Sequence, residues 1–164
     1  MKVLFLDVDG VLNSTKWMMS DDRVTLHGGV WGMNINAVNI LKYIVDKTKC
    51  KIVVSSSWRI GGIEEGSSFY EELKRTDPSD TILNAVIGKT PQGGYRIDEI
   101  GNGKSYVRGN EIQLWIDDNE FDGKFAILDD DSDMAHLSPK LVQTNLDVGL
   151  TRADANKVIN LLKD

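Results

Sequence analysis

Two carboxylates, Asp7 and Asp9, stand one residue apart at the end of the apolar run 3–6. Ionised groups this close repel each other unless a positive charge lies nearby. Paired carboxylates can supply a nucleophile and a general acid–base, and they can also bind a hard metal ion. Their spacing therefore indicates a site that works with a cation.

Two further polar groups follow apolar runs in the same way. The serines Ser55 and Ser56 come after residues 51–54, and the acidic run 129–133 comes after residues 125–128. A charge run by itself is most often solvated surface, but an apolar strand in front of it favours a site. Carboxylates without a nearby histidine or cysteine cluster favour Mg²⁺ over zinc.

The elements that would position these groups alternate along the chain. Short apolar runs predict strands at 2–6, 51–55, 124–131 and 140–144. Helical spacing predicts helices at 34–47, 67–75, 80–87 and 109–118, and a last helix that begins with the capping box of Thr151 and Asp154. The alternation predicts an α/β fold with a Rossmann-like parallel sheet and helices on both faces. Ligands bind beyond the carboxyl ends of such strands, so the three polar groups should converge.

Composition excludes several classes of protein. The chain has 164 residues, 41% of them hydrophobic and 27% charged, which is typical of one soluble domain spanning 1–164. A net charge of −6 argues against an extended nucleic-acid groove. No apolar segment is long enough to span a membrane, and the lone Cys50 is consistent with a cytoplasmic location.

Four motifs in order resemble those of the haloacid dehalogenase (HAD) superfamily of phosphohydrolases. DVDGV (7–11), VVSSSW (53–58) and ILDDDSD (127–133) are similar to the first, second and fourth motifs. The third motif is normally a lysine before the helix that precedes the acidic strand. In SYVRGNEI, Arg108 stands at that place, and Lys104 is its rival. The resemblance covers roughly residues 3–151 and is greatest to a compact branch found inside multidomain RNA-repair proteins.

This resemblance implies a Mg²⁺-dependent phosphatase with an aspartyl-phosphate intermediate. Asp7 would be the nucleophile and Asp9 the general acid–base. Ser55, helped by Ser56, would bind a phosphoryl oxygen, and Arg108 would stabilise the charge of the transferring group.

The metal and substrate residues also follow from the resemblance. Mg²⁺ would be held by Asp7, the backbone carbonyl of Asp9, and Asp129 or Asp130. The segment 60–107 between the second and third motifs is too short for a large cap, so we expect a small cap or insertion, or none. A lightly covered site suits a bulky substrate such as a phosphorylated nucleic-acid end or a nucleotide. The residues expected at this substrate are Gly10, Ser56, Trp58, Arg59 and Lys104.

Alternatives remain open at the level of the sequence. Trp58 belongs either to the core or to a surface that stacks on a base or sugar. The same motifs would also serve a phosphotransferase or mutase acting on small phosphorylated metabolites. A catalytically silent phosphate-binding module is disfavoured, because both aspartates of the first motif and the acidic run are present.

Overall fold

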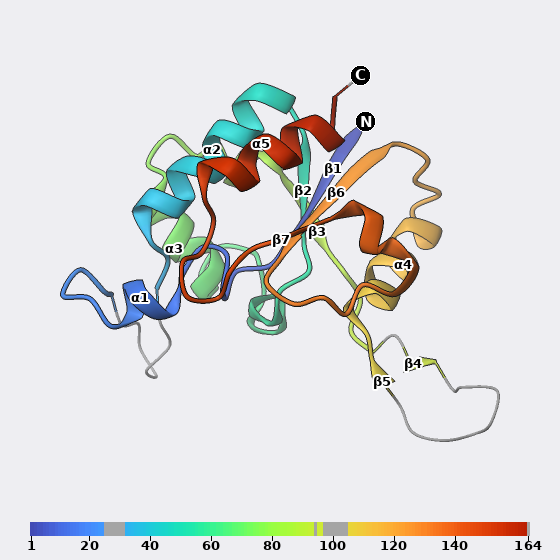
Figure 1. The fold of residues 1–164 in the computed structure, drawn as a ribbon, viewed down its shortest axis with the longest axis horizontal. Helices are drawn as coiled ribbons and strands as arrows, with labels where there is room; N and C mark the ends of the chain where they lie inside the picture. Colours follow the sequence, from blue (N-terminus) through green and yellow to red (C-terminus); the bar gives the residue numbers. More distant parts are fainter. Residues whose placement is uncertain (25–31, 94, 97–104, 164) are drawn as a thin grey trace.

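A five-stranded parallel sheet forms the centre of the molecule (Figure 1). The computed structural model describes residues 1–24, 32–93, 95–96 and 105–163. The strands lie in the order β3-β2-β1-β6-β7, with neighbours paired in parallel. Their bounds are β1 Lys2–Leu6, β2 Lys51–Val54, β3 Val86–Lys89, β6 Lys124–Asp129 and β7 Leu141–Gln143. The predicted α/β fold is confirmed.

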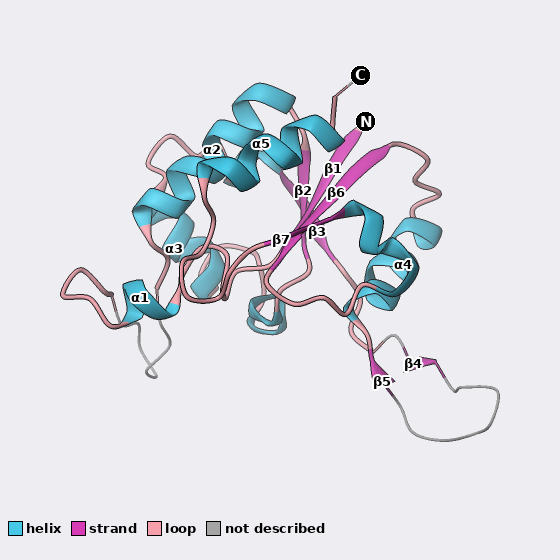
Figure 2. Cartoon of the chain, viewed as in Figure 1, coloured by secondary structure: helices cyan, strands magenta, loops and turns pink. Residues whose placement is uncertain are grey.

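Helices cover both faces of the sheet (Figure 2). On one face, α2 (Ile35–Thr48) packs against α5 (Arg152–Leu161) and α3 (Ser68–Thr76). On the other face, α4 (Arg108–Asp118) packs against the 3₁₀ helix η3 (Ala135–Lys140). Side chains alternate between the two cores, so Leu4 and Leu6 face α2 and α5 while Val3 and Phe5 face α4. Burial on both faces explains why the strands β1, β2 and β6 have continuous apolar runs in the sequence.

One predicted helix is wrong. Residues 80–87 contain only the 3₁₀ turn η2 (Leu83–Ala85), and the chain then continues as the edge strand β3. The Asp77 carboxylate accepts a hydrogen bond from the backbone of Ile82 at 2.8 Å and so stabilises the turn, and β3 pairs with β2. The hydrogen bonds of this pairing outweigh the helical spacing of the apolar residues.

Much of the segment between the second and third motifs belongs to the body of the molecule. It begins in the 3₁₀ helix η1 (Ser57–Gly61), which contacts α3, and β3 joins the central sheet. Strands β4 (Tyr95–Arg96) and β5 (Ser105–Tyr106) form a separate antiparallel pair. A short helix, α1 (Thr15–Met18), follows the first motif. Lys104 lies outside the described residues.

The topology places a switch point between the neighbouring strands β1 and β6. From β1 the chain proceeds outward to β2 and β3, and later returns on the other side of β1 to form β6 and β7. At such a switch point the connections leave in opposite directions, and ligands bind beyond the carboxyl ends of the strands. Asp7 and Asp129 lie at these two strand ends.

Within the described ranges, no helix has the length and apolar character required to cross a membrane.

Candidate active site

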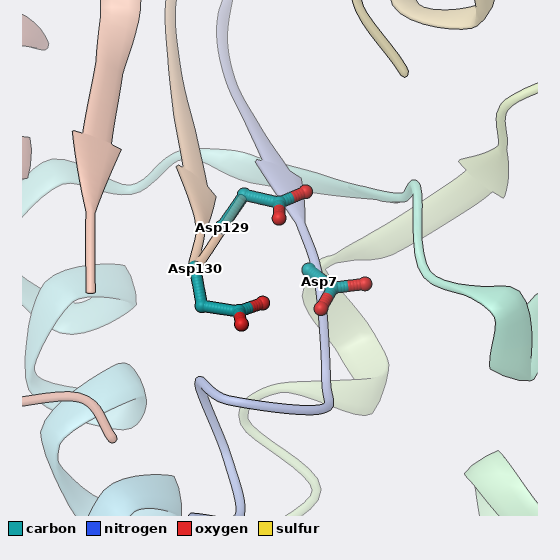
Figure 3. Close-up of side chains that lie close together, drawn as sticks. All are labelled: Asp7, Asp129 and Asp130. Atoms are coloured by element: carbon teal, nitrogen blue, oxygen red, sulfur yellow. The ribbon is translucent and has the colours of Figure 1, made fainter. Parts of the chain in front are cut away.

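Three aspartates gather at the switch point. Asp7 follows β1 directly, Asp129 is the last residue of β6, and Asp130 comes next. One carboxylate oxygen from each lies within 4.8 Å of the others (Figure 3). Asp7 is 5% exposed and Asp129 is 1% exposed, so two of the three carboxylates are withdrawn from water.

The backbone conformation of Gly10 leaves room for the carboxylate of Asp130 in the cluster. Gly10 has a φ of +73°, and a Cβ on this residue would overlap the carboxyl group of Asp130. Only glycine combines this conformation with such a close approach. The expectation that Gly10 contacts substrate stays a prediction, but its observed neighbour is Asp130. In this structure, the absence of a side chain at Gly10 therefore allows Asp130 to approach the first motif.

Burial makes the cluster costly without a positive partner. Desolvation raises the pKa of Asp7 to about 6, against the lowering effect of Arg108 and of a hydrogen bond with Ser56. Desolvation and the charge of Asp7 raise the pKa of Asp129 to about 8. Asp129 Oδ2 is buried, and among the described residues it has no hydrogen-bond partner. Clustered carboxylates with an unsatisfied buried oxygen fit a hard divalent cation.

These pKa values predict how the stability of the metal-free protein depends on pH. Both carboxyl groups hold their protons more tightly in the folded chain than at their usual pKa of 3.8 in the unfolded chain. The free energy of unfolding should therefore fall as pH rises from about 4 to about 8. Thermal denaturation in EDTA across this range measures the effect. In the variant Asp129→Asn, the free energy of unfolding should change little with pH above about pH 6. A wild-type protein that becomes more stable toward pH 8 in EDTA would contradict the prediction.

Arg108 supplies the positive charge nearest to the cluster. Its guanidinium lies 3.5 Å from Asp7 Oδ1 and 3.9 Å from Asp129 Oδ2, and it also donates to the carbonyl of Ser55. Arg108 is the first residue of α4, where the helix dipole adds to its positive charge. The structure thus places Arg108 at the acids, whereas Lys104, the other cation proposed for the third motif, lies outside the described residues.

The start of α4 is docked against the acidic loop. The backbone N–H of Arg108 donates to Asp133 Oδ2 at 3.0 Å, and that of Gly109 donates to the Asp133 carbonyl at 3.1 Å. A Cβ on Gly109 would overlap the backbone of Met134. Asp133 therefore caps the helix that carries Arg108, and it is not among the three clustered acids.

The serines of the second motif lie at the same edge of the sheet. Ser55 is fully buried, and within the described chain its Oγ has no hydrogen-bond partner. The Ser56 hydroxyl lowers the pKa of Asp7 and accepts a hydrogen bond from the backbone N–H of Trp58 at 3.3 Å. An unsatisfied hydroxyl beside the acids and Arg108 suits an oxygen of a bound anion.

Asp9 is exposed and has two side-chain partners. Asn13 Nδ2 donates to one of its carboxylate oxygens, and the indole N–H of Trp58 donates to the other. Asn13 was not recognised from the sequence, although its place four residues after Asp9 in the first loop indicates a side chain close to Asp9. Trp58 packs against the core and also reaches the site, so neither of its two alternatives describes it completely.

Arg59, expected at the substrate, is held by buried partners. Its side chain is 5% exposed and forms a 2.6 Å ion pair with Glu111 of α4. The guanidinium also donates to the carbonyls of Ser55, Ser56 and Thr90. These contacts leave Arg59 buried under the second motif, because its charge is matched by a residue far away in sequence. Glu111 was not recognised from the sequence.

A cavity of about 270 Å³ adjoins Arg108. Its lining includes Ser57, Gln92 and Asp133, together with the Arg59–Glu111 pair. The cavity thus offers polar groups next to the cation of the site.

Comparison with known proteins identifies one match. The model of a family described as "HAD domain in Swiss Army Knife RNA repair proteins" matches residues 3–155. No curated protein and no solved structure matches the chain.

Proposed function

The chain belongs to the family of HAD domains in Swiss Army Knife RNA repair proteins, and on this premise we propose that it is a Mg²⁺-dependent phosphomonoester hydrolase. The single observation that carries the proposal is the meeting of three aspartates and Arg108 at the switch point of the sheet. A nucleophilic carboxylate, further acidic ligands and a cation are what covalent phosphoryl transfer requires.

The acidic cluster fits the metal. Asp7, Asp129 and Asp130, with the carbonyl of Asp9, would hold Mg²⁺. When bound, Mg²⁺ neutralises charge between the nucleophile and the phosphoryl group. The raised pKa values of Asp7 and Asp129 support this role, because a divalent cation offsets their unfavourable burial.

The chain's own residues perform two displacements in this proposal. A carboxylate oxygen of Asp7 attacks phosphorus, the bond to the leaving oxygen breaks, and Asp9 gives its proton to that oxygen. Water then attacks the phosphorus of the aspartyl-phosphate and gives a proton to Asp9, which releases phosphate and restores Asp7. Ser55 donates to a phosphoryl oxygen, and Arg108 stabilises the charge that develops on the group.

We further propose a phosphorylated nucleic-acid end as the substrate. The family's description refers to RNA repair, and the cavity beside Arg108 gives space for the group that bears the phosphate. The net charge of −6 disfavours a long basic groove, so contacts should be limited to the terminal nucleotides. A cytoplasmic location remains a prediction from the sequence.

Phosphate release tests the function directly. With Mg²⁺, we expect hydrolysis of phosphomonoesters, and EDTA should abolish it until Mg²⁺ is restored. In a panel of 3′- and 5′-phosphorylated oligonucleotides, nucleotides and sugar phosphates, the oligonucleotides should have the highest kcat/KM, because remote contacts lower the barrier.

The alternatives give different results in the same assay. A phosphotransferase would pass the phosphoryl group to an added acceptor instead of to water. A silent module would bind phosphate without turnover, and full activity in EDTA would exclude the acidic cluster as a metal site. Faster turnover of sugar phosphates would overturn the nucleic-acid substrate and leave the phosphatase intact.

Arg108→Ala should lower kcat more than it raises KM, because the guanidinium acts on charge that develops in the transition state. Removal of one such donor typically costs about 10²–10³-fold in kcat. Lys104→Ala is the control and should leave both constants within about twofold of wild type. If Lys104 proves the costly substitution, the cation of the third motif is Lys104 instead.

A further inference from the structure

Asp9 has a hydrogen-bond donor on each of its carboxylate oxygens. Asn13 Nδ2 donates to Oδ1 at 2.7 Å, and Trp58 Nε1 donates to Oδ2 at 3.1 Å. The terminal torsion of an aspartate is broad when the carboxyl group is free. A donor on each oxygen restricts this torsion, so the exposed carboxyl group of Asp9 is held in one plane.

Both donors are themselves held by the body of the protein. Asn13 is 1% exposed, and its Oδ1 accepts from the backbone N–H of Gly10 at 3.1 Å, which determines which end of the amide faces Asp9. Trp58 packs its ring against the main core, and its backbone N–H donates to Ser56 Oγ. The orientation of Asp9, which is itself exposed, is therefore set by the buried Asn13 and the partly buried Trp58.

The second motif contacts both aspartates of the first. Ser56 lies close enough to lower the pKa of Asp7, and Trp58, two residues later, donates a hydrogen bond to Asp9. The same Ser56 hydroxyl accepts from the Trp58 backbone. One short segment thus links the nucleophile to the group that would transfer the proton.

We propose that Trp58, together with Asn13, is a positioning residue that holds Asp9 toward the leaving oxygen of the phosphoester. This inference rests on the proposed phosphatase function. Trp58 transfers no proton itself, and it acts by keeping the carboxyl group of Asp9 in place while the bond from phosphorus to the leaving oxygen breaks. Its contribution should therefore depend on how much the leaving group requires a proton.

The leaving group supplies the decisive measurement. An alkoxide is strongly basic and must be protonated as it leaves, whereas p-nitrophenolate leaves readily without a proton. In Trp58→Phe, which keeps an aromatic ring but lacks the N–H, kcat/KM for glycerol phosphate should fall about 10- to 100-fold, the loss typical of a small displacement. For p-nitrophenyl phosphate, kcat/KM should stay within about twofold, because this leaving group departs without a proton and the later attack of water on the aspartyl-phosphate does not enter kcat/KM.

Three controls separate positioning from a general effect on structure. Trp115→Phe alters a core tryptophan of α4 that packs on Phe5, and it should leave the ratio of the two substrates unchanged. In the Asp9→Asn background, Trp58→Phe should cause no further loss, since both act on one step. If phenylalanine disturbs folding, incorporation of benzothienylalanine at position 58 keeps the bicyclic shape without the N–H.

The outcomes are distinct. A selective loss on glycerol phosphate in the Trp58 variants supports the proposal. Equal losses on both substrates, or no loss on either, would overturn it while wild-type activity preserves the phosphatase function. A wild type that hydrolyses neither substrate with Mg²⁺ would overturn the proposed function itself.

Discussion

Asp7→Asn is expected to lower kcat by more than about a thousandfold, because an amide cannot form the aspartyl-phosphate. The fold should persist. The Asp7 carboxyl group is buried and its pKa is raised to about 6, so in EDTA at pH 8 the neutral amide should not lower the free energy of unfolding. Phosphate release and thermal denaturation of the same preparation measure the two effects.

A neighbouring acid supplies the matched control. Asp131 belongs to the same acidic run, but it is exposed and lies outside the three-aspartate cluster. Asp131→Asn should keep kcat within about twofold of wild type. Retention of more than about a tenth of wild-type kcat by Asp7→Asn would reject covalent catalysis by Asp7.

The second large effect concerns stability. Glu111→Gln should reduce the free energy of unfolding by about 3–5 kcal/mol, because it removes the negative charge that faces the buried guanidinium of Arg59 at 2.6 Å. The loss should extend beyond the pair. Glu111 Oε1 also accepts from the backbone N–H of Gly93 at 3.1 Å, so the carboxylate links the second-motif segment, the chain after β3, and α4. Denaturant titration measures the change.

An exposed ion pair tests whether burial is the cause. Lys74 and Asp80 lie 2.8 Å apart, with side chains 43% and 36% exposed. Asp80→Asn should cost less than about 1 kcal/mol, as is usual for surface pairs. Asparagine also tolerates the positive φ of 54° at this position, so the backbone adds little. Similar losses in the two variants would show that the Arg59–Glu111 pair has no special weight.

The elements with continuous local patterns were predictable from sequence. The buried strands β1, β2 and β6, and the capping box of Thr151 and Asp154 at the start of α5, appear where expected. Strand β3 was missed, because Val86–Lys89 contains a glycine and an exposed isoleucine, and it becomes a strand by pairing with β2. The pairing of β3 with β2 cannot be inferred from the residues of β3 alone.

In the candidate site as well, features that follow from local patterns were predicted, and contacts between distant residues were not. The convergence of Asp7 and Asp129 followed from strand ends in a parallel sheet, and the motif order suggested Arg108. Contacts between residues far apart in the sequence were missed. Arg59 was expected at the substrate, and its pairing with Glu111, 52 positions later, could not be seen in the sequence.

The docking of Gly109 on Met134 couples the position of Arg108 to that of the acidic loop. Because α4 begins directly against the acidic loop, with the N–H groups of Arg108 and Gly109 bonded to Asp133, the cation and the acids form one mechanical unit. In the proposed phosphatase, a shift of the loop that suits a larger ion would also move the guanidinium relative to Asp7. A substitution that changes ion preference would therefore be expected to change phosphate affinity as well.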